Sequence, residues 1–215
     1  SSTRYLAAME DFVRFIESES IIEKIKQHTH KGFYDSIVST RKPFGLATNT
    51  IPMESGDIVL KHNKGYGAYD STLIEKGKNM IPMWKVIISR LTAEHAGQTD
   101  ASGRKRVLSS LAVLKPQEIC TETYLVVDAV KTKSEVDNVI KYLSTCFVRF
   151  LISLLASTQQ MNKDKFKYVP QQDFTSNSNI DWSKSIAEID KQLYEKYGLE
   201  QSEIDFIESK IKPME

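Results

Sequence analysis

Cysteine and long apolar runs are both scarce in this sequence. The two cysteines among the 215 residues, Cys120 and Cys146, stand far apart in a chain without a recognisable secretory signal. We therefore expect reduced, buried thiols, which argues against a small disulfide-stapled fold. The densest apolar run, residues 146–156, contains Arg149 and Ser153. It is too short for a membrane span, which needs about 20 mostly apolar residues, so we expect a water-soluble cytoplasmic protein.

Recognisable catalytic motifs are absent as well. The sequence has neither a Gly-x-x-x-x-Gly-Lys-Ser/Thr phosphate loop nor a Gly-x-Ser-x-Gly nucleophile elbow. All six prolines are isolated, so the Asn/Asp-Pro-Pro-aromatic tetrapeptide of adenine-methylating enzymes is missing. A restriction nuclease needs an acidic-x-Lys triplet on a strand, but the triplet at residues 208–210 lies in a predicted terminal helix. The residues alone therefore predict no active site.

Two weaker patterns have simple structural explanations. Gly65, Tyr66 and Gly67 form a bare Gly-x-Gly without the helix signature of a nucleotide site, which favours a tight turn. His28 and His30 are two residues apart and would face different sides of a helix. Nothing nearby in the sequence supplies further ligands, so we expect no metal site there.

The composition is typical of a folded globular protein, with 40% hydrophobic and 27% charged residues. The net charge of +1 hides an uneven distribution. Residues 41–106 contain eleven Lys and Arg against six Asp and Glu, a balance of +5. Residues 163–215 contain eight against eleven, a balance of −3. A basic middle beside an acidic tail favours a polyanionic partner for the middle, with an ordinary solvated surface as the alternative.

The pattern of short runs predicts an α+β fold, with a β-rich central platform backed by a long buried helix and with helices at both termini. Runs divided by Gly, Pro and Asn predict strands at residues 57–62, 84–90, 107–114 and 119–130. Residues 94–106 are small and polar and end in three basic residues, which is typical of a mobile loop. We expect three segments: an N-terminal helix in residues 1–32, a β-rich core with the long helix in 33–162, and a C-terminal helical segment in 163–215.

The long helix is expected over about residues 134–157, because apolar residues repeat there at steps of three and four. Cys146 lies on this apolar stripe, which indicates a core position rather than a nucleophile. Asp137, Lys141 and Arg149 fall largely off the stripe, so we expect Arg149 to be a boundary residue that points outward. Further helices are predicted at residues 2–26, 183–197 and 202–212.

Four stretches resemble a known family, in this order: "RKPFGLATNT" (41–50), "VIKYLSTCFVRFLISLLASTQ" (139–159), "YVPQQDF" (168–174) and "LYEKYGLEQSEIDFIESKIKPM" (193–214). Together they resemble the C-terminal target recognition region of bacterial type II restriction–modification adenine-specific DNA methyltransferases, some of them fused to a nuclease. The last stretch is the most specific. In that family this region follows the catalytic domain and reads the DNA sequence, and the enzyme uses S-adenosylmethionine. Because the catalytic core is missing here, we expect a fragment with no cofactor of its own.

The resemblance implies two partners, double-stranded DNA and the upstream methyltransferase domain of the same protein. DNA recognition needs cations on phosphates and forked or amide side chains at base edges. Ten basic residues in or next to the β-rich middle are the candidates: Arg41, Lys42, Lys61, His62, Lys64, Lys85, Arg90, Arg104, Lys105 and Arg106. Solvated surface is the alternative for each of them taken singly. Tyr66, Tyr69 and Trp84 could stack on an extruded base, with core or turn packing as the alternative.

Two other classes of function stay open at this point. The chain could be a protein–protein assembly module without DNA contact, in which case the acidic C-terminal helices would form the working surface. It could also be a nuclease or methyltransferase domain whose active site has no recognisable motif. The DNA site, the oligomeric state and the presence of a nuclease in the parent protein do not follow from these residues.

Overall fold

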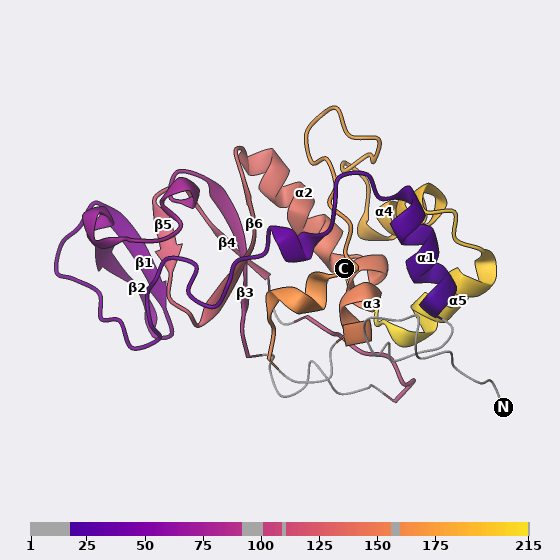
Figure 1. Ribbon diagram of the computed structural model, residues 1–215, viewed down its shortest axis with the longest axis horizontal. Coiled ribbons are helices and arrows are strands. Elements are labelled where there is room, and N and C mark those ends of the chain that lie inside the picture. The colour runs from indigo at the N-terminus through magenta and orange to yellow at the C-terminus, as the bar shows by residue number, and fades with distance from the viewer. Residues whose placement is uncertain (1–17, 92–100, 109–110, 156–159, 215) are drawn as a thin grey trace.

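Two small sheets and a group of helices follow one another along the long axis of the molecule (Figure 1). The computed structural model describes residues 18–91, 101–108, 111–155 and 160–214. Helices and sheets occur in separate layers, with the sheets at one end and most helices at the other (Figure 1). The predicted α+β fold class is therefore confirmed.

The outer sheet has the strand order β2-β1-β5 and contains β1 (Ile58–His62), β2 (Gly65–Tyr69) and β5 (Glu118–Cys120). β1 runs antiparallel to β2 and parallel to β5. The sequence analysis missed β2, because its two glycines were interpreted as a tight turn. The turn is instead formed by Asn63 and Lys64, and Gly65 follows it with φ 138°, a value that favours glycine.

The inner sheet is antiparallel, with β3 (Trp84–Ser89) between β4 (Leu111–Leu114) and β6 (Tyr124–Val130). Its strands are apolar on both faces, since Val86 and Ile88 pack toward the helices while Ile87 packs toward the outer sheet. The predicted strand at 119–130 is wrong as one element: it is divided between β5 and β6, which belong to different sheets. The predicted strand at 107–114 is shorter than expected, and residues 109–110 lie outside the described part.

The expected long helix is broken into α2 (Lys133–Ser144) and α3 (Cys146–Leu155), which are bent by 63°. The break lies at Thr145, whose backbone is extended and whose hydroxyl donates to Tyr142 O and accepts from Val148 N. The Asp190 carboxylate then caps α3 by accepting from Cys146 N and Phe147 N, both at 2.9 Å. Within the described residues no single helix is long and apolar enough to cross a membrane, although this bent pair reaches that length and composition.

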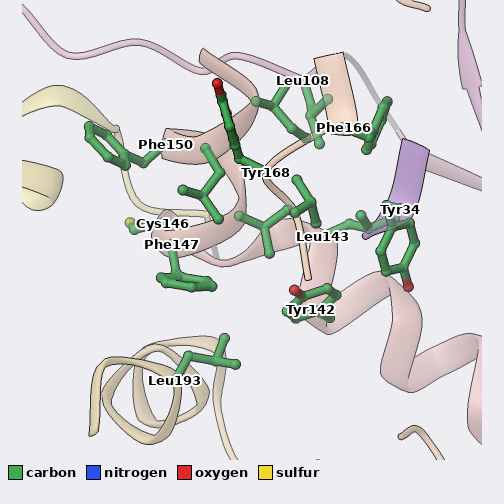
Figure 2. Packing of buried hydrophobic residues seen from close by; sticks show 14 of the residues in the cluster. Tyr34, Leu108, Tyr142, Leu143, Cys146, Phe147, Phe150, Phe166, Tyr168 and Leu193 are labelled. Atoms are coloured by element: carbon green, nitrogen blue, oxygen red, sulfur yellow. The ribbon is translucent and has the colours of Figure 1, made fainter. Parts of the chain in front are cut away.

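The remaining helices are α1 (Ser18–His28), α4 (Ile186–Lys196), α5 (Gln201–Lys210) and the short turns η2 (Tyr34–Ser36), η3 (Ser71–Leu73), η4 (Lys78–Met80) and η5 (Lys163–Phe166). α4, α5 and η5 pack against α2 and α3, whereas Met80 of η4 packs between the two sheets. Phe147 of α3 and Leu193 of α4 point toward one another (Figure 2). Both residues belong to the main hydrophobic cluster of the molecule. All three predicted segments contribute to this main cluster, for example through Ile25, Phe147 and Leu193. Residues 2–17 of the predicted N-terminal helix lie outside the described residues.

Candidate nucleic-acid interface

A turn at residues 121–123, between β5 and β6, brings three separate segments together. Thr121 N donates to the carbonyl of Lys61 at 3.1 Å, at the end of β1. Glu122 N donates to Leu46 O at 2.9 Å, and the Thr123 carbonyl accepts from Arg90 N at 2.9 Å. The turn therefore places the 41–50 segment, β1 and the end of β3 next to each other, although they are far apart in the sequence.

Glu122 is the anionic centre of this turn. Its side chain is buried, and its carboxylate accepts from Arg41 Nε at 2.8 Å and from Thr48 N at 3.3 Å. Burial by itself would raise the pKa of Glu122, but these hydrogen bonds and the charges of Arg41 and Lys42 lower it below its usual value. Glu122 is therefore ionised at neutral pH and holds Arg41, whose side chain is still 69% exposed.

Lys61 of the outer sheet contacts two aromatic rings, Tyr66 of β2 and Tyr124 at the start of β6. Its Nζ atom is 4.2 Å from the ring centroid of Tyr66 and 5.2 Å from that of Tyr124, and it donates to Tyr66 Oη at 3.1 Å. The antiparallel register sets Lys61 directly opposite Tyr66. Partial burial would lower the pKa of Lys61, but the hydrogen bond to Tyr66 and the neighbouring Tyr124 raise it above its usual value. The result is a fixed cation beside a ring that is 55% exposed.

Six of the ten predicted residues belong to this region. Lys42 is exposed beside Arg41, His62 is half-exposed at the end of β1, and Lys64 is exposed in the β1–β2 turn. Arg90 is half-buried and donates from Nη1 to the Glu122 carbonyl at 3.4 Å. We define the lobe cluster as these six basic residues with the two tyrosines: Arg41, Lys42, Lys61, His62, Lys64, Arg90, Tyr66 and Tyr124.

Lys85 does not belong to the lobe cluster, and its prediction as a DNA contact is corrected by the structure. Its side chain is fully buried between the sheets. Its ammonium donates to four main-chain carbonyls, those of Met80, Ile81, Met83 and Lys115, at 2.7–3.2 Å. Burial lowers the pKa of Lys85 to about 8. Lys85 fastens the loop before β3, and its charge does not reach the surface.

Arg104, Lys105 and Arg106 lie elsewhere, in the helical half of the molecule. Lys105 pairs with Ile211 in a parallel bridge just after α5. β1 and β2 lie at one end of the molecule, and α5 lies toward the other end (Figure 1). The end of the expected mobile loop is thus tied to the C-terminal segment, while residues 92–100 lie outside the described part.

The three aromatic residues proposed for base stacking have different surroundings. Tyr69 packs against a second hydrophobic cluster, which lies between the two sheets, and Trp84 packs against the main cluster. Both residues therefore serve packing. Tyr66 is exposed, as stacking requires. The sequence analysis did not single out Tyr124, because it begins an apolar strand. Its position beside Lys61 depends on how the two separate sheets lie next to each other.

A groove of about 1090 Å³ lies outside this region, between α2 and the 174–183 segment. Its walls include Asn138, Lys141, Trp182 and Gln192, and none of the ten predicted residues lines it. In the described part of the chain, no group of three or more His, Cys, Asp or Glu is arranged to hold a metal ion. The lobe cluster is therefore the candidate site, because it contains six of the ten predicted residues.

We compared the chain with protein-family models, with curated proteins and with solved structures. None of them matches it. The resemblance to target recognition regions therefore depends on the four sequence stretches alone, and the chain is not assigned to a family.

Proposed function

We propose that this chain is a DNA-recognition module that contacts duplex DNA through the lobe cluster. The observation that carries the proposal is Lys61, whose ammonium contacts the rings of Tyr66 and Tyr124 in a region that also contains Arg41, Lys42, Lys64 and Arg90. The buried carboxylate of Glu122 is already paired with Arg41. Cations beside an exposed aromatic ring can combine phosphate contacts with contacts to bases.

The shape of the outer sheet supports the same proposal. β1 and β2 form an antiparallel hairpin at one end of the molecule (Figure 1). The major groove of DNA is about 12 Å wide and admits a two-stranded ribbon. Lys64 in the hairpin turn and Arg41, which Glu122 holds beside the end of β1, would contact phosphates, while Tyr66 and His62 would lie nearest the base edges.

The sequence resemblance supports a finer proposal about the parent protein. In that proposal the chain is the target recognition region of a restriction–modification adenine-specific DNA methyltransferase. An upstream domain then binds S-adenosylmethionine and carries out the methyl transfer, and this chain selects the DNA sequence. The endonuclease activity of some members of that family belongs to a further domain.

The salt dependence of DNA binding tests the first proposal. For wild type, the logarithm of the binding constant should fall with the logarithm of salt concentration by roughly 0.9 per phosphate contacted. Replacing Lys61 and Lys64 with Gln should flatten this slope by about two units if each contacts one phosphate. The matched control is Lys184→Gln with Lys191→Gln, which removes the same charge from exposed positions in and beside α4.

Two outcomes contradict the proposal. If the lobe variant and the control weaken binding equally, the effect is overall charge and the lobe cluster is not the contact surface. If wild type does not bind duplex DNA even at low salt, the chain is better explained as a protein–protein assembly module.

A further inference from the structure

The second set of cations lies on a pair of extended segments that face away from the helices. Lys105 N donates to Lys210 O at 2.9 Å, and the carbonyl of Lys105 accepts from Lys212 N at 3.0 Å. These bonds pair residues 104–106 in parallel with residues 210–212, where α5 ends. We call these six residues the basic strand pair, because five of them are Lys or Arg and the sixth is Ile211.

Strand alternation places Lys212 on the surface side of the pair, because the side chain of its neighbour Ile211 is fully buried. Lys210 is the last residue of α5, and its ammonium lies 5.1 Å from the ring centroid of Phe206. In a parallel pair with Lys105 opposite Ile211, Arg104 lies beside Lys210 and Arg106 lies beside Lys212. Arg106 and Lys212 are exposed, and Arg104 and Lys210 are half-buried.

Arg149 holds the pair from beneath. Its side chain is fully buried, and its Nη1 atom donates to Arg106 O at 3.3 Å and to Lys212 O at 2.6 Å. Its Nε atom donates to the carbonyls of Ser144 and Thr145 at the α2–α3 break. One guanidinium therefore fixes both segments against the core, and it adds a further positive charge below the surface.

Some of these cations also have partners within the chain. Arg104 Nε donates to Ser102 Oγ at 2.9 Å, and Glu208 lies exposed in the last turn of α5. The exposed side chains of Arg106 and Lys212 therefore carry the surface charge of this pair. A face of this kind, presented by ordered backbone, fits an extended polyanion better than a single small anion.

We propose that the basic strand pair is a second contact surface for the phosphate backbone of duplex DNA. This inference rests on the proposed function of the lobe cluster, and it assigns the two surfaces different tasks. The lobe cluster, with its exposed Tyr66, contributes to base recognition, whereas the basic strand pair carries no aromatic ring and binds without regard to sequence. The surfaces lie in opposite halves of the molecule, so a duplex that contacts both runs along the long axis (Figure 1).

The test uses the whole chain and a duplex of about 30 base pairs, titrated between about 50 and 200 mM salt. Arg106→Gln with Lys212→Gln removes the two exposed cations of the pair and leaves Arg149 in place. We expect the salt slope to flatten by one to about two units, with the melting temperature unchanged. Affinity for a selected sequence and for a random sequence should fall by the same factor.

The controls separate this inference from the proposed function. Lys184→Gln with Lys191→Gln should leave the slope close to that of wild type, and Lys61→Gln with Lys64→Gln should flatten it. Tyr66→Ala, which removes the exposed ring of the lobe cluster, should change the preference between the two duplexes. If the Arg106 and Lys212 variant matches the control, the basic strand pair is not a DNA surface, and the lobe cluster is judged by its own variant. If the Arg106 and Lys212 variant weakens binding and the Lys61 and Lys64 variant does not, the basic strand pair is supported and the lobe cluster is contradicted. If wild type binds neither duplex, both proposals are overturned.

Discussion

Arg149 and Lys85 are buried cations that are held by main-chain carbonyls rather than by bonded carboxylates. The Arg149 guanidinium donates to the carbonyls of Ser144, Thr145, Arg106 and Lys212, and Lys85 donates to four carbonyls in the same way. Such carbonyls lie where helices and strands end and have few partners of their own. Each cation therefore links several segments of the chain, because it donates to carbonyl groups at the ends of different helices and strands.

We predict that Arg149→Ala lowers the free energy of unfolding by about 3–5 kcal/mol, because it leaves buried carbonyls without a donor and opens a cavity. The sequence pattern predicted an outward-facing residue with a small effect, and that prediction is wrong because Arg149 is fully buried. Urea denaturation measures the change. Arg106→Ala is the matched control, since its side chain is exposed, and it should change stability by less than about 1 kcal/mol. An Arg149→Ala variant as stable as this control would show that the guanidinium contacts do not stabilise the fold.

At the scale of elements, the junction of α2, α3 and α4 decides the shape of the helical layer. Asp190 of α4 reaches across to cap the first turn of α3, and the Thr145 hydroxyl closes the end of α2. Without these two side chains the apolar stripe would favour one continuous helix. α2 covers the inner sheet, whereas the bend directs α3 toward α4, α5 and η5. The same bend places Arg149 under the basic strand pair.

Asp190 should make the stability of the protein depend on pH. Burial raises the pKa of Asp190 to about 6, although the N–H groups of Phe147 and Cys146 and the charge of Arg149 lower it. The unfolded value is about 3.9. The folded state therefore binds more protons than the unfolded state between about pH 4 and 6, and stability from this group increases as pH falls through that window.

The matched comparison is wild type against Asp190→Asn, which cannot titrate. We expect the difference in unfolding free energy, wild type minus variant, to rise by about 1–3 kcal/mol when pH is lowered from about 7.5 to 4.5. Denaturation by urea at several pH values gives this difference, and other carboxylates cancel in the subtraction. A difference that stays constant or falls with decreasing pH would mean that the pKa of Asp190 is not raised in the folded state.

The whole molecule is organised by two hydrophobic clusters that share the inner sheet. Ile87, Val126 and Leu114 face the outer sheet, whereas Val86, Ile88 and Leu125 face the helices. Because the same three strands form one wall of both clusters, neither cluster can lose its packing without exposing the other. We therefore expect the outer sheet and the helical layer to unfold together.

Two variants, one in each cluster, test this cooperativity. Phe44→Ala lies in the cluster between the sheets and Phe147→Ala in the main cluster, where its ring stacks on Tyr197 at 5.1 Å. Each should lower stability by about 3–5 kcal/mol. Far-ultraviolet circular dichroism and tryptophan fluorescence should show one coincident transition for both proteins. If the two probes gave different unfolding midpoints for Phe44→Ala, the outer sheet would unfold separately from the helical layer.

The sequence by itself determined the α+β class and the approximate places of β1, β3, α4 and α5. These elements follow from local causes: apolar residues at strand or helix spacing, bounded by turn and capping residues such as Ser185 and Gly198. It also indicated which part of the chain carries an excess of cations. Six of the ten predicted site residues lie near one turn, but Lys85 and residues 104–106, which belong to the same basic stretch, do not.

Only the tertiary structure decided which cations reach the surface and which neighbours they have. Lys85 and Arg149 are buried because carbonyls from distant segments surround them, and periodicity along one helix or strand contains no information about those segments. The break at Thr145 depends on Asp190, and the pairing of Lys105 with Ile211 joins residues more than a hundred positions apart. Hydrogen-bond partners of this kind are chosen by packing, because a buried polar group takes whichever partner the folded chain brings within reach.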